Sequence, residues 1–368
     1  MNNESLLYTL ALQKTPNIGD ITAKKLIQYC GSAEAVFKEK ENNLQAINGI
    51  GKNVIKSLQN SNLLQQAEKE IKFINQNNIQ VWYYQDKDYP QRLKNCIDGP
   101  ILLFHTGNIN LKQQHIISIV GTRNISPQGK RICEKIIEEL SVLNPIVVSG
   151  FAYGTDISAH KAAIDNNLQT IACLAHGMNQ IYPKAHKKYM HQVEENGGFI
   201  TEFWSSSNPD RENFIKRNRI IAGLSEATLV IESAEKGGSL VTADIANSYN
   251  REVFALPGRA EDNYSVGTNN LIKTQKAQLI SSAADIIYYL NWEVKQKQQK
   301  QVQTQLFTDL NSTEEKIIAF LRNREKVGLD EIAFSCQLPI FSTSSSLLNL
   351  ELKGLIRPHA GKQFELIV

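Results

Sequence analysis

The chain has 368 residues, which exceeds one ordinary domain and predicts two or three domains. Hydrophobic residues make up 42% and charged residues 21%, so the chain can build hydrophobic cores and is too apolar to be disordered. The 40 Lys+Arg against 37 Asp+Glu give a net charge of +3, which excludes a histone-like protein but not a local basic patch. No apolar run approaches the roughly 18 residues needed to span a bilayer. The first residues lack the features of a secretory signal, so we expect a cytoplasmic protein without membrane contact.

The five cysteines are scattered and form no Cys-x-x-Cys pair. This pattern is typical of reduced, buried thiols. His186 and His191 lie five positions apart, but no third ligand follows in register. The sequence therefore predicts no metal site and implies no cofactor.

The first segment, 1–75, has the apolar spacing of short helices separated by small turns. Residues 15–26 and 47–55 both resemble helix-hairpin-helix motifs. The glycines of such hairpins expose backbone N–H groups at a helix start, which suits a sequence-independent contact with DNA phosphates. A small helical domain that contacts proteins is the alternative.

The second segment, 80–292, alternates short apolar runs with longer amphipathic ones. This alternation predicts an α/β fold, an extended Rossmann-like, doubly wound and mostly parallel sheet with helices on both faces. Several of the predicted strands end in glycine and lead into a helix. The strands are expected at 116–120, 146–149, 170–174, 199–202, 228–231 and 252–256.

The third and fourth segments differ sharply in composition. Residues 293–311 are dominated by Gln and Lys, cannot bury apolar surface, and predict a flexible linker. Residues 312–368 return to a compact pattern. It predicts three helices, one opening at Thr313 and two over 329–334 and 342–352, followed by strands at 354–357 and 364–367.

Three glycine turns follow strands of the predicted sheet, at 120–123, 149–154 and 237–239. Ligands of such sheets bind beyond the carboxyl ends of the strands, where glycine lets the backbone approach and helix N-termini attract anions. Each turn alone could be only a tight connection. Three on one edge, with Arg123 in the first, favour phosphate binding.

The usual nucleotide motifs are missing from these turns. No Gly-x-Gly-x-x-Gly opens a helix after the first strand, and no acidic residue ends the second strand to hold a ribose. The Gly-x-x-x-x-Gly-Lys-Ser/Thr motif is also absent. The predicted phosphates therefore belong to a ligand other than a dinucleotide or ATP.

Further basic residues stand close to aromatic ones. Lys184 follows Tyr182-Pro183, and Arg217 and Arg219 flank Asn218 a few positions after Phe214. An arginine fork holds phosphate oxygens, and aromatic rings stack on bases, a combination that suits single-stranded nucleic acid. A solvated, charged helix face is the alternative.

A series of motifs along 119–287 carries a resemblance to a known family. They are Val120-Gly121-Thr122-Arg123, Val148-Ser149-Gly150-Phe151-Ala152, Ile181-Tyr182-Pro183, Arg217-Asn218-Arg219-Ile220-Ile221-Ala222-Gly223-Leu224, Gly238-Ser239-Leu240-Val241-Thr242-Ala243 and Leu256-Pro257-Gly258. In content, order and spacing the run resembles the DprA/Smf family of DNA-processing proteins.

The resemblance implies a function and partners. Members bind single-stranded DNA taken up in natural transformation, protect it and help load the RecA recombinase, without catalysing a reaction. It also implies a homodimer through the Rossmann-like domain. The DNA-binding residues carried over from it are Gly121, Arg123, Ser149, Gly150, Lys184, Arg217, Asn218, Arg219, Gly238 and Ser239.

The four cationic residues of this set are assigned to phosphates, and the glycine and serine backbone to closer phosphate contacts. Asn218 is expected to fix the loop or to touch a sugar or base. The chain departs from the family pattern at Thr155 and at Thr201. It also departs at Lys276, the one of these positions where the family usually has glycine. The change at Lys276 concerns the loop geometry there and leaves the pocket unaffected.

The segment 312–368 resembles the winged-helix domain at the C-terminus of many family members. Its expected recognition helix begins Ser342-Thr343-Ser344-Ser345-Ser346 and is almost uncharged. Because a helix that reads the major groove normally carries Arg, Lys, Asn or Gln, we expect a protein-interaction or regulatory role. A sequence-specific regulator is the disfavoured alternative.

An enzyme on a related Rossmann scaffold, such as a nucleotide phosphoribohydrolase, is the second function considered. Such enzymes carry Pro-Gly-Gly-x-Gly-Thr followed by glutamate, whereas here Gly237-Gly238-Ser239 is followed by Asp244. Asp156 and His160 are four apart on one helix and could form an acid/base couple. The favoured interpretation is an N-terminal helix cap and a structural histidine.

Overall fold

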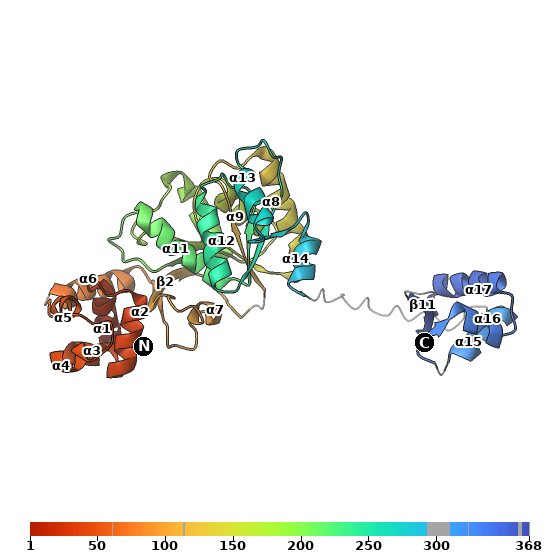
Figure 1. Ribbon diagram of the computed structural model, residues 1–368, viewed down its shortest axis with the longest axis horizontal. Helices are drawn as coiled ribbons and strands as arrows, with labels where there is room; N and C mark the ends of the chain where they lie inside the picture. Colours follow the sequence, from red (N-terminus) through yellow and green to blue (C-terminus); the bar gives the residue numbers. More distant parts are fainter. Residues whose placement is uncertain (61, 113–114, 293–309, 323, 360–362, 368) are drawn as a thin grey trace. The chain divides into compact units, whose positions relative to one another are not determined.

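The computed structural model describes residues 1–368 except 61, 113–114, 293–309, 323, 360–362 and 368. The chain divides into two compact units, Met1–Val294 and Lys295–Val368 (Figure 1). The linker expected at 293–311 lies outside the described residues, apart from Leu310 and Asn311.

In the part of the first unit that the structure describes, six helices come first and lead into a large sheet. The leading helices are α1 (Asn3–Lys14), α2 (Asp20–Cys30), α3 (Ala33–Lys38), α4 (Glu41–Gln45), α5 (Lys52–Leu58) and α6 (Asn62–Gln76). The later helices are α7 (Gln91–Lys94), α8 (Pro127–Leu140), α9 (Thr155–Asp165), α10 (Met190–Glu195), α11 (Arg211–Leu224), α12 (Gly238–Ser248), α13 (Val266–Lys273) and α14 (Ala283–Tyr289), with short 3-10 turns η1 (Ser141–Leu143) and η2 (Lys184–Tyr189).

The sheet has nine strands in the order β1-β2-β6-β5-β4-β3-β7-β8-β9. Strand β2 pairs antiparallel with β1 and β6, and every other pairing is parallel. The strands are β1 (Gln80–Tyr83), β2 (Leu102–Gly107), β3 (Ile116–Val120), β4 (Ile146–Ser149), β5 (Thr170–Cys173), β6 (Gly197–Thr201), β7 (Ala227–Val230), β8 (Glu252–Ala255) and β9 (Gln278–Leu279). The doubly wound, mostly parallel fold predicted from the sequence is confirmed.

Helices cover both faces of the sheet because alternate strand residues point to opposite sides. In β3, Ile117 and Ile119 pack with residues of α8, α9 and α14 in one core. Their neighbours Ile116 and Val120 join the opposite core with α11, α12 and α13. Strands buried on both faces carry near-continuous apolar runs, which is why the sequence revealed them so clearly.

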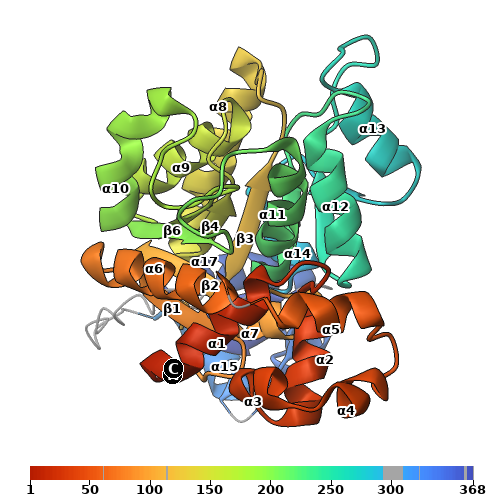
Figure 2. The same cartoon turned by 90° about the vertical axis from the view of Figure 1, so that its left-hand side faces the viewer.

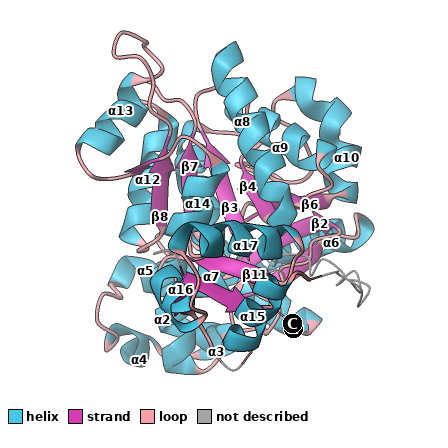
Figure 3. Ribbon diagram, turned by 90° about the vertical axis from the view of Figure 1, so that its right-hand side faces the viewer, coloured by secondary structure: helices cyan, strands magenta, loops and turns pink. Residues whose placement is uncertain are grey.

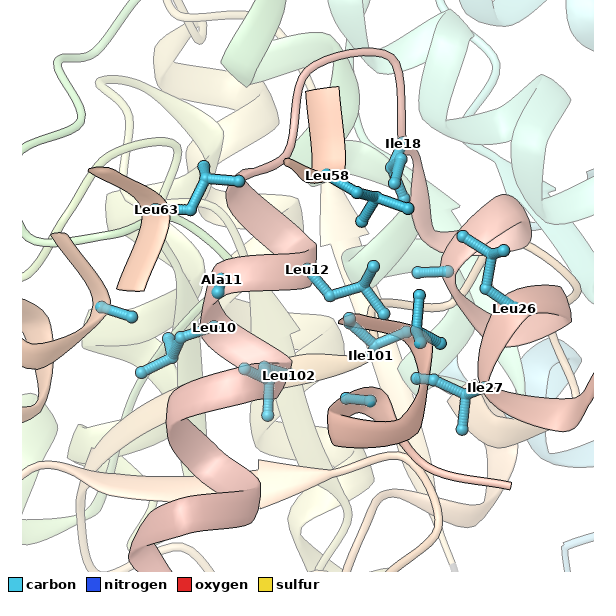
Figure 4. Close-up of a cluster of buried hydrophobic side chains, with 14 of the residues drawn as sticks. Leu10, Ala11, Leu12, Ile18, Leu26, Ile27, Leu58, Leu63, Ile101 and Leu102 are labelled. Carbon is cyan, nitrogen blue, oxygen red and sulfur yellow. The ribbon is translucent and has the colours of Figure 1, made fainter. Parts of the chain in front are cut away.

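The N-terminal helices share a core with the start of the sheet. Leu10 and Leu12 of α1 lie beside Ile101 and Leu102, which lead into and begin β2 (Figure 4). The ribbon likewise places these helices against β1 and β2 (Figure 2). The boundary expected between 75 and 80 therefore does not separate two cores, and 1–294 forms one compact unit.

Over its described residues, the second unit has three helices and a three-stranded sheet of order β10-β12-β11 (Figure 3). Its elements are α15 (Ser312–Leu321), β10 (Val327–Gly328), α16 (Leu329–Ser335), α17 (Ile340–Leu352), β11 (Ile356–His359) and β12 (Gln363–Leu366). Asn311 caps α15 with a reciprocal Asn311–Glu314 capping box. The helices and the antiparallel β11–β12 wing match the winged helix expected from the sequence.

Candidate nucleic-acid pocket

Backbone hydrogen bonds join the first glycine turn to the segment that follows β7 and to the start of α9. The N–H of Thr122, after β3, donates to the carbonyl of Glu232, after β7, at 2.7 Å. The N–H of Thr155, at the start of α9, donates to the carbonyl of Thr122 at 3.1 Å. Parallel strands bring the three glycine turns expected to bind phosphate to one edge of the sheet. The two hydrogen bonds fix the first turn against the loop after β7 and the start of α9.

Glycine is required at Gly154 for two physical reasons. Its φ of 74° lies in the left-handed region, which side chains disfavour. A Cβ there would also collide with the backbone of Thr122 and Arg123. The second turn can therefore pack directly against the first, and a larger residue would push Arg123 away from the sheet edge.

The turns enclose a pocket of about 320 Å³ at the carboxyl ends of β3 and β7. Its walls come from the first turn, the start of α9, helix α11 and the start of α12. The lining residues are Val120, Gly121, Thr122, Arg123, Ala152, Asp156, Phe214, Arg217, Asn218, Ile221, Ala234, Gly237, Gly238, Ser239 and Thr242.

The N-terminus of α12 forms one wall of this pocket. Gly237 caps the helix without a side-chain hydrogen bond, and a Cβ at Gly238 would meet no atom within 4 Å. The hydroxyl of Ser239 hydrogen-bonds Ser233 at 2.9 Å, and the amide of Asn218 donates to the carbonyl of Gly238 at 3.4 Å. This wall presents an open helix N-terminus, which attracts anions.

Helix α11 contributes four lining residues with a helical spacing. Phe214, Arg217, Asn218 and Ile221 stand at positions i, i+3, i+4 and i+7 and face the pocket together. Ile221 and Thr242 lie within the motifs that carry the family resemblance but are not among the predicted DNA-binding residues. The period of the helix is the signal that identifies Ile221, and it also places Arg219 on another side.

Arg123 is an exposed cation at the mouth of the pocket. Its guanidinium lies 5.1 Å from the centre of the Phe214 ring. Among the described residues it makes no ion pair with a carboxylate. The ring of Tyr182, 39% exposed, packs edge-on against Phe214 at 5.7 Å. The mouth therefore combines a cation without an acidic partner and two aromatic rings.

Arg217 is almost entirely buried, with 5% of the residue exposed. Its guanidinium donates to the carbonyl of Cys173 at the end of β5, and its Nε has no hydrogen-bond partner among the described residues. Burial lowers the pKa of Arg217, and the nearby Asp156 carboxylate opposes that shift. The side chain supplies positive charge to the back wall of the pocket.

Two predicted site residues lie behind this wall and do not line the pocket. The hydroxyl of Ser149 is buried and donates to the carbonyl of Ile119 at 2.6 Å, which joins β4 to β3. A Cβ at Gly150 would collide with the Asp156 carboxylate and the Arg217 guanidinium. Glycine at 150 is thus what allows Arg217 and Asp156 to approach the strand end.

Arg219 lies on the opposite side of α11 from the pocket. It forms ion pairs with Asp20 of α2, at 3.0 Å, and with Glu202 after β6. Burial raises the pKa of Glu202 to about 7, although Arg219 acts in the opposite direction. The structure therefore gives Arg219 a role in joining the N-terminal helices to the sheet, and does not bring it to the pocket as expected.

Lys184, the remaining predicted contact, is exposed at the start of η2. It does not line the pocket. Of the ten predicted site residues, the structure brings six into the pocket wall: Gly121, Arg123, Arg217, Asn218, Gly238 and Ser239.

His160 is fully buried with both ring nitrogens engaged. Nδ1 lies 2.7 Å from the hydroxyl of Thr170, and Nε2 lies 2.6 Å from the carbonyl of Gly150. Burial lowers the pKa of His160. Asp156 accepts a hydrogen bond from the N–H of Ala152 at 3.1 Å. These contacts favour a structural role for both residues over an acid/base couple. The N-cap expected at Asp156 is wrong, because α9 is capped by Gly154 and Asp156 lies inside its first turn.

Within the described residues, no group of three or more His, Cys, Asp and Glu side chains could hold a metal ion. In the same part of the chain, no helix is long and apolar enough to cross a membrane.

Comparison with known proteins identifies relatives over both units. The family model of DNA recombination-mediator protein A matches residues 80–291, and the DprA winged helix domain matches 303–362. The Smf protein of Synechocystis sp. is 31% identical over 99% of this chain and its own full length. The DNA processing protein DprA of Streptococcus pneumoniae is 37% identical over 55% of this chain and 71% of its own.

Two solved structures share the fold. That of DNA processing protein A from Streptococcus pneumoniae superposes with a TM-score of 0.66 at 30% identity, covering 78% of this chain and 98% of that one. A structure of the Helicobacter pylori protein, described by its single-stranded DNA binding mode, has a TM-score of 0.53 at 27% identity, covering 58% and 95%. With a family model over more than half its length, the chain belongs to the DNA recombination-mediator protein A, or DprA/Smf, family.

Proposed function

We propose that the pocket binds single-stranded DNA and that the chain acts as a recombination mediator. The observation that carries this proposal is the pairing of an open helix N-terminus at Gly238 with the exposed cation of Arg123 in one pocket. Both features attract a phosphate, and they approach it from different elements. A ligand with a phosphate in reach of both satisfies the electrostatics of the site.

The aromatic rings at the mouth extend this proposal from phosphate to nucleotide. Phe214 contacts both the Arg123 guanidinium and the Tyr182 ring. A base stacked on Phe214 or Tyr182 places its own phosphate towards the cation. Stacking of this kind needs an unpaired base, because the faces of paired bases are occupied within a duplex. The arrangement therefore favours a single strand over a duplex.

The proposed DNA contacts are the six predicted residues that line the pocket. Arg123 and the backbone at Gly121, Gly238 and Ser239 bind phosphate oxygens. Arg217 supplies charge from the back wall, and Asn218 holds the Gly238 loop through its 3.4 Å hydrogen bond. Lys184 is exposed outside this wall, where it can contact the strand only beyond the pocket.

The biological role rests on family membership. A related structure is described by its single-stranded DNA binding mode, and the family is named for recombination mediation. We propose that this chain protects incoming DNA during natural transformation and helps to load RecA. We also propose that it works as a homodimer through the Rossmann-like domain, without catalysing a reaction.

The enzymatic alternative has weaker support in the site. Asp244, the acid that follows the Gly237 turn, is half-exposed and pairs with Lys276 at 2.9 Å. It does not line the pocket. Release of a free base from a nucleoside monophosphate by the purified chain would nonetheless establish that activity.

A mobility-shift experiment tests the proposed function. Labelled oligo-dT and a duplex of equal length are titrated with the chain, each with and without RecA. We expect tighter binding of the single strand and a ternary complex or faster RecA filament formation on it. Equal affinity for both forms would contradict the single-strand proposal, and RecA assembly unaffected by the chain would contradict the mediator role.

A further inference from the structure

The outer face of helix α17 carries a row of large exposed apolar side chains. Phe341 is 80% exposed, Leu348 56% and Leu352 79%, and Ser345 between them is also exposed. These four positions are spaced by four, three and four residues, the repeat that aligns side chains on one helix face. We call them the α17 stripe.

The opposite face of α17 is already used by its own unit. Thr343, Ser346, Leu347 and Leu350 are buried. Leu347 and Leu350 belong to the core formed with Ile317 and Ile332. The helix is therefore apolar on both sides, and a helix of that kind is normally covered on both. Figure 1 draws α17 along an outer edge of the second unit.

The charge of α17 disfavours nucleic acid as the partner that binds the α17 stripe. Glu351 is the one charged residue within Ile340–Leu352. Phosphate contacts need Lys or Arg, and a base-reading helix needs polar side chains at its exposed positions. An apolar protein surface fits the stripe better than DNA does.

The spacing of the stripe makes it complementary to itself. The interval sequence four, three, four reads the same in both directions. When two copies pair antiparallel, Phe341 meets Leu352 of the second copy, and Ser345 meets Leu348 of the second copy. The small serine thus faces the large leucine at the centre, and the two bulky ends interlock. Such isologous pairing is the usual geometry of a two-fold contact.

Electrostatics also favour the antiparallel arrangement. The N-cap of α17, Pro339, provides no side-chain hydrogen bond, so the first N–H groups of the helix lack a capping side chain. In an antiparallel pair, Glu351 of one copy lies near that N-terminus of the other. A carboxylate beside a helix N-terminus is stabilising, and the pair has two such contacts.

The exposed area is sufficient for a weak, reversible contact. The stripe presents on the order of 400 Å² per copy, or about 800 Å² for a pair, which is the size of a weak, reversible interface.

We propose that α17 forms an antiparallel helix pair with the α17 of a second copy of this chain, through Phe341, Ser345, Leu348 and Leu352. This contact lies in the winged-helix unit. It is separate from the dimer proposed through the Rossmann-like domain and does not depend on DNA binding.

Directed cysteine cross-linking of the full chain tests the pairing. The partly exposed Cys30 and Cys336 are first replaced by serine, and the other three cysteines are buried. Phe341→Cys and Leu352→Cys are then made in separate chains and oxidised alone or mixed. Antiparallel pairing brings 341 of one copy within disulfide reach of 352 of the other, and separates like positions by about 16 Å along the axis.

We expect covalent dimer mainly in the mixture, about tenfold more than in either chain alone. Adding Leu348→Asp to both chains should abolish it, whereas Asn349→Asp, which places the same charge beside the stripe on exposed α17 surface, should not. Circular dichroism checks that both variants fold.

Three results would overturn the proposal: no cross-link in the mixture, cross-linking of Phe341→Cys with itself, or a cross-link insensitive to Leu348→Asp. Sedimentation of the Leu348→Asp chain without cross-linking measures whether the dimer through the Rossmann-like domain still forms when the α17 contact is disrupted. Loss of the α17 cross-link with an intact dimer, or the reverse, therefore separates the two proposals.

Discussion

Arg217 and Arg219, two positions apart on α11, face opposite sides of that helix. Arg217 lines the pocket and donates to the carbonyl of Cys173, whereas Arg219 pairs with Asp20 and Glu202 at the junction with the N-terminal helices. Two positions correspond to about 200° around a helix, so both side chains cannot serve one ligand. One arginine belongs to the candidate DNA site and the other to the architecture.

Arg219→Ala should destabilise the chain and leave DNA binding nearly unchanged. At pH 8, above the raised pKa of Glu202, the substitution leaves the Asp20 and Glu202 carboxylates unpaired in a largely buried site, which costs about 3 kcal/mol in the free energy of unfolding. Urea unfolding measures this loss, and anisotropy with labelled oligo-dT measures affinity. The triple variant Asp20→Asn, Glu202→Gln, Arg219→Ala should recover much of the stability. A large loss of affinity in folded Arg219→Ala would place Arg219 in the DNA site after all.

Gly238→Val should block the pocket without unfolding the chain. A Cβ at 238 meets no protein atom within 4 Å, and the residue does not adopt a positive φ. The new side chain instead occupies space beside the helix N-terminus where a phosphate would bind. We expect at least about a tenfold loss of oligo-dT affinity, equivalent to about 1.4 kcal/mol. Gly328→Val, at an equally open glycine in the second unit, is the matched control, and comparable losses in both would refute the steric explanation.

Phe214→Ala should weaken binding chiefly through the loss of base stacking. Stacking on an aromatic side chain contributes about 1–3 kcal/mol per base, so an oligo-dT should bind about tenfold more weakly. An oligomer with abasic sites offers no base to stack and should show a much smaller difference between Phe214→Ala and the unmodified chain. An identical loss on both oligomers would indicate that Phe214 acts only by positioning Arg123.

Glu202 should make stability depend on pH. Burial raises its pKa from 4.5 to about 7, so the folded chain holds a proton on Glu202 that the unfolded chain has released between these values. The free energy of unfolding contributed by Glu202 therefore falls as pH rises from about 4.5 to about 7, and then levels off. Urea unfolding between pH 5 and 8 measures the slope. Glu202→Gln should flatten it, and an equal slope in both chains would contradict this origin.

The fold could be predicted well from the sequence because its strands are buried on both faces. Runs such as 116–120 and 146–149 consist only of apolar or small residues and end in glycine turns. The apolar pattern and the turn residues therefore predict the same strand and the same strand end. The shared core of α1 and β2 was not predictable in the same way. It depends on contacts between Leu12 and Ile101, which are far apart in sequence and leave no periodic signal.

The candidate site could be predicted only in part, because the sequence places residues at strand ends but does not fix the direction of their side chains. Glycine turns and Arg123 stand at strand ends, and topology alone brings strand ends together. Side-chain direction along α11 was the missing information for Arg219, and it is fixed by the ion pairs with Asp20 and Glu202. Lys184 follows β5 in sequence, yet the intervening loop takes it outside the pocket wall.

The salt dependence of oligo-dT binding by Arg123→Ala tests the central claim most directly. Arg131→Ala, an exposed arginine on α8 outside the pocket, is the matched control. If Arg123 binds a phosphate, its loss should weaken binding about tenfold at low salt and reduce the slope of log affinity against log salt by about 0.7, while Arg131→Ala changes neither. Unchanged affinity and slope in Arg123→Ala would contradict the assignment of this pocket to single-stranded DNA.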